Sequence, residues 1–338
     1  MSGLGEPLLV VEGLKKYFVQ GGGFLAGERH VVKAVDGVSF TVDRGETLSL
    51  VGESGCGKTT TGRLVLRLLE PDEGRIVFDG VDITHMSRRE LRPYRTRMQM
   101  IYQDPYASLN PRKPVGEAIA EPLLVHGLAT REEARDRAMA MLERVGLTPA
   151  EDFYERIPSQ LSGGQRQRAV IARAMILKPE FVVADEPVSM IDVSMRASIL
   201  ELLKSFQEEY GLAMIFITHD LSVARIISDK IAVMYLGKIV EYGEADEVLR
   251  DPRHPYTMAL ATAAPSIRLR RKKRLEIKGE IADPRNVPPG CRFHTRCPFA
   301  EEKCRVEEPP LREVESGRRV ACHYPLAKGY LEGWLKGQ

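Results

Sequence analysis

Residues 47–70, TLSLVGESGCGKTTTGRLVLRLLE, decide the fold class. The run 47–51 is typical of a strand buried on both faces of a sheet, and the residues after Thr60 carry a helical pattern. The loop between them matches G-x-x-x-x-G-K-[ST], with its fixed positions held by Gly52, Gly57, Lys58 and Thr59. A strand, this loop and a helix in that order predict a nucleotide-binding α/β protein.

The chemistry of phosphate binding explains the residue types in this loop. Glycines let successive backbone N–H groups turn toward a β-phosphate, and the helix N-terminus adds partial positive charge. Lys58 is expected to contact the β- and γ-phosphates, and the Thr59 hydroxyl to bind Mg²⁺. The candidate nucleotide-binding residues here are Gly52, Glu53, Ser54, Gly55, Cys56, Gly57, Lys58, Thr59 and Thr60.

Two further apolar runs, 181–185 and 214–219, each end in polar side chains. Parallel strands bring such ends to the same crevice of an α/β sheet. Asp185 is therefore predicted to hold Mg²⁺, and Glu186 to act as the general base that activates a water. His219 is predicted to sense the γ-phosphate and to orient that water.

The segment LSGGQRQR, residues 161–168, indicates a second anion site in the same chain. Ser162 and Gln165 fit an S-x-x-Q capping box at a helix start. Gly163 and Gly164 leave the backbone N–H groups beside that helix N-terminus uncovered. A simple kinase or GTPase needs only one such site, and the guanine-selecting N-K-x-D motif is absent.

On these motifs the sequence resembles the ATP-binding subunit of an ABC transporter. GESGCGKTT corresponds to its Walker A motif, FVVADEP to Walker B and LSGGQ to its signature motif. The resemblance implies that Gln103 is the Q-loop glutamine, which contacts Mg²⁺ and the attacking water and communicates with the membrane partner. It also implies that Asp192, in SMID, lies at a dimer seam and that Tyr17 stacks on adenine.

The resemblance further implies a mechanism in which two subunits pair head to tail. Each ATP then lies between the Walker A motif of one chain and the signature motif of the other. Hydrolysis removes the shared γ-phosphate and opens the dimer, a two-state change biased by the ligand.

Three more stretches resemble the oligopeptide/dipeptide importer group: 102–112, 254–265 and the cysteine-containing tail. This implies an ATP-driven motor that works with two integral-membrane permease subunits and an extracytoplasmic substrate-binding protein. The second ATPase subunit is either another copy or a related chain. The cargo could instead be an oligosaccharide or a nickel chelate, and a non-transport ABC ATPase is a further alternative.

Composition bounds the class of protein and its partners. The chain has 338 residues, 43% of them hydrophobic, and a formal net charge of +2. Nearly balanced charge disfavours nucleic acid as a partner. No apolar run approaches the about 18–20 residues of a membrane span, and the N-terminus does not resemble a signal peptide. We expect a peripheral protein on the cytoplasmic face of the cell membrane.

The expected fold is α/β, with an ABC-type core built on a mostly parallel sheet. An N-terminal antiparallel β subdomain precedes the core, and a helical subdomain at about 104–178 is inserted into it. The predicted domains are a nucleotide-binding domain at 1–255 and an extension with a cysteine cluster at 256–338.

Four of the five cysteines fall near the C-terminus, namely Cys291, Cys297, Cys304 and Cys322. Disulfides are unexpected in cytoplasm, and the tight pairs of a zinc ribbon are missing. Resemblance to members of the importer group implies a 4Fe–4S cluster here. Zinc and unligated buried thiols remain alternatives, and His294 or His323 could substitute as ligands.

Overall fold

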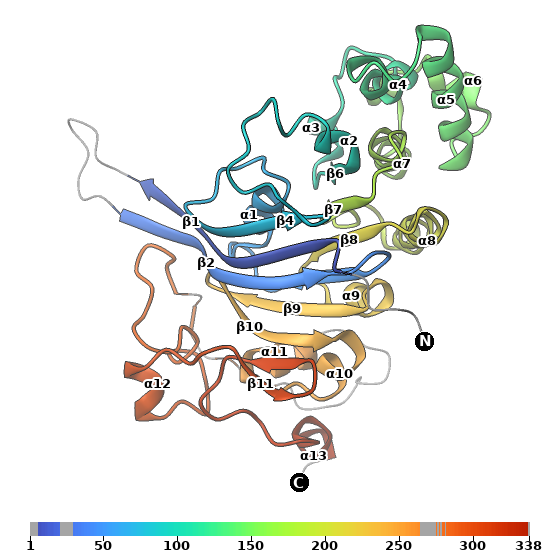
Figure 1. Ribbon diagram of the computed structural model, residues 1–338. Helices are drawn as coiled ribbons and strands as arrows, with labels where there is room; N and C mark the ends of the chain where they lie inside the picture. The colour runs from blue at the N-terminus through green and yellow to red at the C-terminus, as the bar shows by residue number, and fades with distance from the viewer. Residues whose placement is uncertain are drawn as a thin grey trace, which may run out of the picture. The chain divides into compact units, whose positions relative to one another are not determined.

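The computed structural model describes residues 6–20, 30–263, 275, 277, 279–280 and 282–336 (Figure 1). The chain divides into two compact units. Unit 1 comprises Met1–His85 and Phe216–Gln338, and unit 2 comprises Met86–Ile215. Across the described ranges, no helix has the length and apolar character needed to cross a membrane.

Unit 1 begins with an antiparallel sheet in the order β2-β1-β4-β5. Its residues alternate between buried and exposed, and in β2 Val38, Phe40 and Val42 face the interior. One face is therefore solvated, as antiparallel sheets allow. The strands are β1 (Leu9–Gln20), β2 (His30–Val42), β4 (Glu73–Phe78) and β5 (Val81–Asp82).

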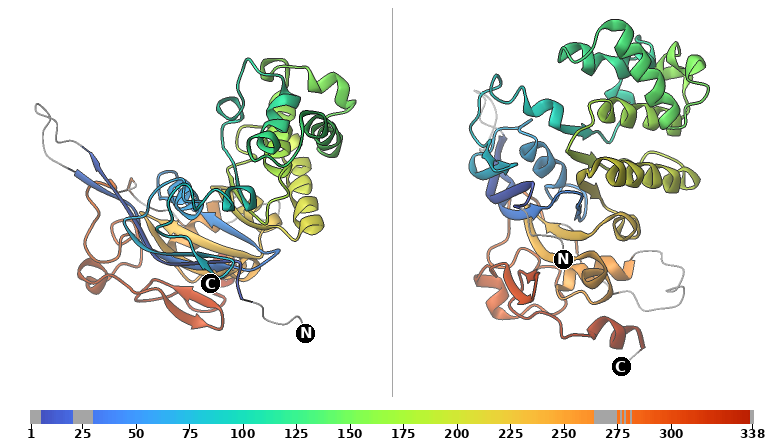
Figure 2. Two further views of the ribbon diagram at one scale, coloured as in Figure 1. Left: turned by 45° about the horizontal axis from the view of Figure 1, so that its top comes forward. Right: turned by 45° about the vertical axis from the view of Figure 1, so that its right-hand side comes forward.

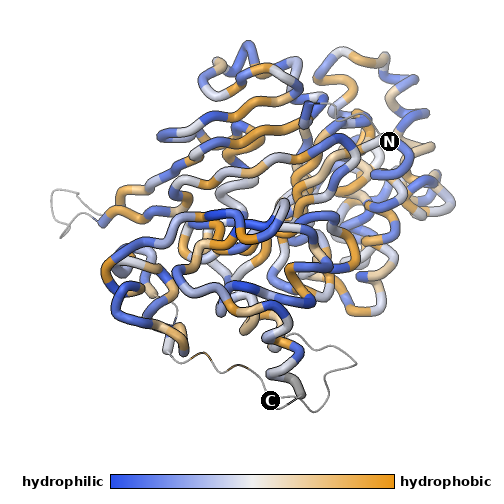
Figure 3. Tube along the Cα trace, turned by 60° about the horizontal axis from the view of Figure 1, so that its bottom comes forward, coloured by the Kyte–Doolittle hydropathy of each residue, from blue (hydrophilic) through white to orange (hydrophobic). Residues whose placement is uncertain are grey.

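The second sheet of unit 1 carries the phosphate loop. Strand β3 (Thr47–Val51) is buried along its whole length and pairs in parallel with β9 (Lys230–Tyr235). Helix α1 (Lys58–Val65) follows the loop after β3. Strand β8 (Ala213–Thr218), which contains the boundary between the units, is likewise fully buried and leads toward α9 (Leu221–Ile227). In Figure 3, hydrophobic segments (orange) run along several extended stretches of the chain.

The C-terminal extension continues this sheet instead of standing apart from it. Strand β9 is followed by the antiparallel strands β10 (Lys238–Glu244), β12 (Arg318–Val320) and β11 (Arg312–Glu315). This part of the sheet is antiparallel, so the sheet is more mixed than the mostly parallel one expected. The hairpin pairs with the β10 edge, whose backbone groups would otherwise lack partners.

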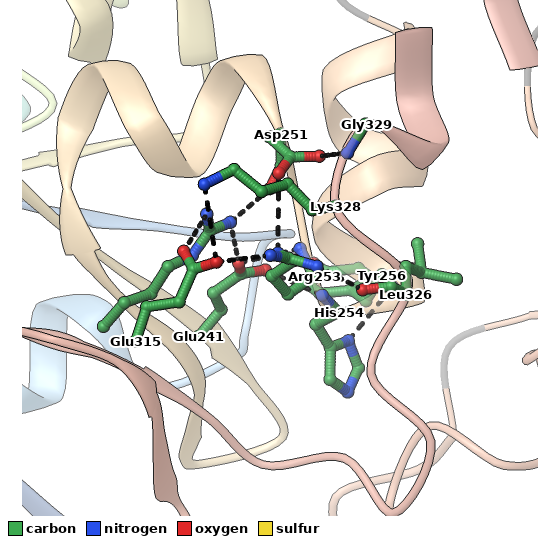
Figure 4. A network of polar contacts seen from close by, with 10 residues as sticks. Glu241, Asp251, Arg253, His254, Tyr256, Glu315, Leu326, Lys328 and Gly329 are labelled. Atoms are coloured by element: carbon green, nitrogen blue, oxygen red, sulfur yellow. Dashed lines mark hydrogen bonds and ion pairs between the residues drawn. The ribbon is translucent and has the colours of Figure 1, made fainter. Parts of the chain in front are cut away.

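A buried ionic network fastens the extension to β10 (Figure 4). The carboxylate of Glu241, fully buried in β10, accepts hydrogen bonds from the Arg318 guanidinium at 2.7 Å and from the backbone N–H groups of Arg253 and His254 at 2.9 Å. Arg253 in turn donates to Leu326 O and to the Glu315 carboxylate. A buried charge is tolerated only when paired in this way. The helices of this region are α10 (Ala245–Arg250), α11 (Pro255–Ala263), α12 (Glu302–Val306) and α13 (Tyr330–Lys336).

Unit 2 combines two strands with a helical body (Figure 2). Strand β6 (Met98–Ile101) pairs in parallel with β7 (Phe181–Asp185), which is wholly buried. The helices bury apolar faces against one another, with Ile119, Ala134 and Leu142 inaccessible to solvent. They are α2 (Tyr94–Arg97), α3 (Pro105–Ser108), α4 (Val115–Val125), α5 (Arg131–Arg144), α6 (Ala150–Tyr154), the 3-10 turn Pro158–Gln160, α7 (Gly163–Met175) and α8 (Val193–Tyr210).

The three apolar runs singled out in the sequence form buried strands, which confirms the α/β fold class. The sequence predicts a helical stretch up to Glu70 after the phosphate loop, but α1 ends at Val65. Arg67 has a φ of 52°, a left-handed backbone conformation that a helix cannot contain.

Candidate nucleotide-binding and hydrolysis site

The phosphate loop of unit 1 needs glycine at two points where backbone passes very close. A Cβ on Gly52 would lie 2.3 Å from Met234 O, and one on Gly57 would lie 2.2 Å from Ala34 O. Gly57 also has a φ of 107°, in the left-handed region that favours glycine. Neither position can carry a side chain without moving its neighbours, so the loop is specified by packing as well as by ligand chemistry.

Lys58 is the central cation of this loop. Its side chain is buried, and the ammonium donates hydrogen bonds to Gly52 O at 2.8 Å and Glu53 O at 2.9 Å. The ammonium is therefore anchored to the backbone at the start of the loop. Thr59 and Thr60 follow in the first turn of α1, next to Lys58.

Tyr17 lies on β1 of unit 1 and is held by its hydroxyl. The phenol donates to Asp36 Oδ1 at 2.5 Å, and burial together with this bond raises the pKa of Tyr17. Burial alone would raise the pKa of Asp36, but hydrogen bonds from Tyr17 and Arg292 outweigh it and hold that pKa below its usual value. The ring is half-buried, and its orientation is fixed through Asp36.

His219 is exposed and directly follows β8 in unit 1. The next residue, Asp220, caps α9 through its carboxylate. The histidine thus sits at a fixed turn between strand and helix, as a strand-end functional residue should.

Unit 2 brings the predicted general base and the predicted Q-loop glutamine together. Asp185 ends β7 and is buried. Glu186 follows with a φ of 46°, and its Oε2 accepts a hydrogen bond from Gln103 Nε2 at 3.3 Å. A left-handed backbone costs a non-glycine residue about 1 kcal/mol, and such strain gathers at functional sites. The turn is held by Ser189, whose N–H and hydroxyl both donate to Glu186 O.

The signature segment of unit 2 forms the capping box predicted from its sequence. Ser162 is the N-cap of α7: its Oγ accepts from Gln165 N at 3.3 Å, and its own N–H donates to Gln165 Oε1 at 3.0 Å. Ser162 is exposed, and a Cβ on Gly163 would meet nothing closer than 3.9 Å. The N-terminal end of this 13-residue helix, with its partial positive charge, therefore lies at the surface of unit 2 at Ser162.

Asp192 occupies the N-cap of α8 without a side-chain cap hydrogen bond. On either side of it, Met190 is 55% and Val193 is 77% exposed. Exposed apolar side chains around an acidic residue suit a contact surface better than a purely solvated turn.

The four C-terminal cysteines line one small cavity in unit 1, together with Phe293, Phe299 and Tyr324. Burial raises the pKa of Cys297 to about 11 and that of Cys322 to about 12. The two candidate histidines also line this cavity, and each has one ring nitrogen in a backbone contact: His294 Nδ1 with Cys291 O and His323 Nε2 with Glu307 O. Within the described part of the chain, no three His, Cys, Asp or Glu side chains are placed to share one metal ion.

Sequence reasoning missed two residues of the extension that touch the phosphate loop. The Tyr256 hydroxyl accepts the Glu53 N–H at 2.9 Å, and Arg296 donates to both Glu53 carboxylate oxygens at 2.7 and 3.0 Å. The one sequence signal for these contacts was Glu53 itself, because an acidic residue inside an anion-binding loop needs a cationic side chain beside it.

Comparisons with known proteins agree with this arrangement. A family model described as ABC transporter matches residues 35–189, and one described as oligopeptide/dipeptide transporter, C-terminal region, matches residues 240–304. A probable peptide ABC transporter ATP-binding protein, y4tS of Sinorhizobium fredii, is 48% identical over 322 residues, covering 95% of this chain and 90% of that protein. The oligopeptide transport ATP-binding protein AppF of Bacillus subtilis is 48% identical, covering 94% of this chain and 97% of its own.

A solved structure of similar fold is the dimeric post-hydrolysis state of the ATP-binding cassette MJ0796 bound to ADP and Pi. It is 29% identical and has a TM-score of 0.63, covering 70% of this chain and 98% of that one.

Proposed function

The chain belongs to the ATP-binding subunits of ABC transporters, with a C-terminal region of the oligopeptide/dipeptide type, and from this we propose that it is the motor of a peptide importer. It is an ATPase that uses ATP and Mg²⁺. The observation that carries the cargo proposal is the match over residues 240–304, because the cassette itself is shared by many transporters.

We propose that unit 1 supplies the groups that hold the nucleotide. The backbone donors of residues 52–60 bind the β- and γ-phosphates, Lys58 neutralises their charge, and Thr59 binds Mg²⁺. The Tyr17 ring stacks on adenine. The hydrogen bond that holds its hydroxyl supports this role, because a ring that is already ordered loses little conformational entropy on binding.

The hydrolysis would use Asp185, Gln103 and Glu186 of unit 2 and His219 of unit 1. Asp185 and Gln103 would hold Mg²⁺, and Glu186 would take a proton from the water that attacks the γ-phosphorus. The hydrogen bond between Gln103 and Glu186 supports a shared task, because it lets the glutamine hold the base in register with that water. His219 contacts the γ-phosphate and orients the same water.

Dimerisation completes the catalytic unit. Ser162, Gly163, Gly164 and Gln165 would bind the γ-phosphate of ATP held by a second ATPase subunit, and Asp192 would lie at the seam. The exposed N-cap Ser162 of α7 and the exposed Met190 and Val193 support this role. The partner is a second copy or a related chain, and the dimeric cassette of similar fold supports pairing.

The full system would contain two integral-membrane permease subunits and an extracytoplasmic substrate-binding protein. The chain would then lie on the cytoplasmic face of the membrane. We also propose the functional division into a nucleotide-binding domain at 1–255, with its helical subdomain at about 104–178, and an extension at 256–338.

The cargo proposal predicts peptide-stimulated ATP hydrolysis in the assembled transporter. The chain would be purified with its permease and ATPase partners in nanodiscs, and phosphate release measured with binding protein loaded with a tetrapeptide or a trisaccharide. Peptide-loaded binding protein should raise the rate, whereas the trisaccharide should not. Stimulation by the trisaccharide alone would contradict the peptide cargo and indicate an oligosaccharide importer, whereas the assignment as an ATPase would stand.

We further propose that the cysteine cavity holds a 4Fe–4S cluster in the cell. Each iron of such a cluster binds one thiolate, so the four cysteines need not share an ion, and their convergence on one cavity supports the proposal. Bound thiolates carry no proton, so loading the cluster would release protons from these buried thiols. The group would then link segments 291–304 and 322 of the extension.

Anaerobically purified protein is accordingly expected to be brown and to contain iron and acid-labile sulfide in equal amounts. Cys297→Ser should lose most of that iron, whereas Cys56→Ser, which changes the one cysteine outside the cavity, should keep it. Colourless, iron-free protein from an anaerobic preparation would leave these residues as unligated thiols.

A further inference from the structure

The loop between Cys291 and Cys297 contacts the nucleotide site at two separate points. Arg296 is buried to 8% exposure of its side chain and forms two parallel hydrogen bonds to Glu53, the second residue of the phosphate loop. Arg292, similarly buried, pairs with Asp36, the residue that holds the Tyr17 hydroxyl. Each arginine lies beside a cysteine that lines the cavity.

Every polar group of Glu53 is held by a defined partner. Its N–H donates to Tyr256, its C=O accepts from Lys58, and its carboxylate accepts from Arg296. Two of these partners belong to the extension. The conformation of the first turn of the phosphate loop is therefore fixed from outside the cassette motifs.

Aromatic packing makes the extension a rigid support beneath the loop. Tyr235, at the end of β9, forms edge contacts with Tyr256 and Phe293, with ring centroids 4.8 and 5.3 Å apart. Arg296 lies over the Tyr235 ring, and all three rings are buried with Val51 at the end of β3. An arginine locked by packing at its stem and by two hydrogen bonds at its head holds its partner closely.

We propose that Arg296 and Arg292 are positioning residues for ATP. Arg296 holds the phosphate loop in its binding conformation, and Arg292 holds the Tyr17 side chain in place through Asp36. The two contacts act on different parts of the nucleotide, the polyphosphate and the base. The proposal rests on the ATP site described above, and it assigns to the cysteine loop a role in nucleotide affinity that the cassette motifs do not contain.

Separate probes for the two parts give a sharp test. Binding of ATP and of inorganic tripolyphosphate, both with Mg²⁺, would be measured by calorimetry on the full-length chain. Arg296→Met should weaken both ligands about tenfold, the equivalent of one charge-assisted hydrogen bond lost from loop organisation. Arg292→Met should weaken ATP and leave tripolyphosphate unchanged. A matched control is Arg305→Met, an exposed arginine beside Cys304, which should change neither affinity.

A double-mutant cycle separates positioning from general destabilisation. Because Arg296 acts through Glu53, combining Arg296→Met with Glu53→Gln should weaken tripolyphosphate binding no further than Arg296→Met alone. Arg296→Lys, which keeps the charge but loses the paired donors, should give an intermediate affinity and serves if the methionine variant does not fold.

The outcomes distinguish this inference from the proposed function. Wild-type protein that bound no ATP would overturn the function itself. Normal wild-type binding with an unchanged tripolyphosphate affinity in Arg296→Met, or strictly additive effects in the cycle, would overturn only the positioning role. Equal losses for both ligands in Arg292→Met would also contradict the separation of the two contacts.

Discussion

Glu186→Gln is expected to bind ATP normally and to hydrolyse it about 10²- to 10⁴-fold more slowly, the range that a general base contributes. Glutamine has almost the shape of glutamate but cannot accept the proton of the attacking water. The Gln103 side chain can still hydrogen-bond the new amide oxygen, so the strained turn after β7 should be preserved. This variant should therefore keep its ATP affinity and lose most of its hydrolysis rate.

The accompanying signature is accumulation of an ATP-bound dimer. ATP that is not cleaved keeps its γ-phosphate between the two subunits, and the closed state then persists. Single-turnover phosphate release would measure the rate, and light scattering with Mg-ATP would measure the dimer. Turnover near the wild-type rate would show that another group activates the water.

A second substitution tests whether the signature segment makes that dimer. In Glu186→Gln with Ser162→Arg, the bulky cation would cover the N-terminal end of α7 and remove the capping hydroxyl. We expect ATP to bind each monomer while the dimer no longer forms. The matched control is Ser87→Arg in place of Ser162→Arg. Ser87 is an exposed serine of unit 2 whose hydroxyl likewise accepts the N–H of the residue three positions later, and its substitution should leave the dimer intact.

Features encoded over a few residues were predictable from the sequence. The runs 47–51 and 181–185 became fully buried strands because a continuous apolar segment has only the sheet interior to fill. The capping box of α7 was also predictable, since serine and glutamine three positions apart can satisfy each other's backbone donors locally. Local patterns of this kind depend on little else in the chain.

Contacts between distant segments were not predictable from those patterns. Nothing near Glu53 indicates that Arg296, 243 positions away, will pair with it, and nothing near Tyr17 indicates Asp36 as its partner. The left-handed backbone of Glu186 was equally hidden, because most non-glycine residues avoid it. Charge pairing and strain are set by tertiary packing, and here they concentrate around the nucleotide site.

Lys58→Met is expected to abolish detectable ATP binding while leaving a folded protein. The ammonium donates to two carbonyls of the phosphate loop, and we expect these donors to turn to phosphate oxygens when ATP binds, where each charge-assisted hydrogen bond contributes about 1.5–3 kcal/mol. Losing two such bonds would weaken ATP binding about 10²- to 10⁴-fold. Methionine keeps most of the buried stem and so limits the packing loss at this site.

The measurement is the increase in unfolding temperature that Mg-ATP produces, because a ligand that binds only the folded state stabilises it by mass action. Wild-type protein should show a concentration-dependent increase and Lys58→Met none, although its own unfolding temperature without nucleotide should fall, since Gly52 O and Glu53 O lose a buried donor. Lys204→Ala, an exposed lysine on α8, should behave as wild type in both respects. A Lys58→Met protein that ATP still stabilised would show that the backbone donors of the loop, and not this cation, dominate phosphate binding.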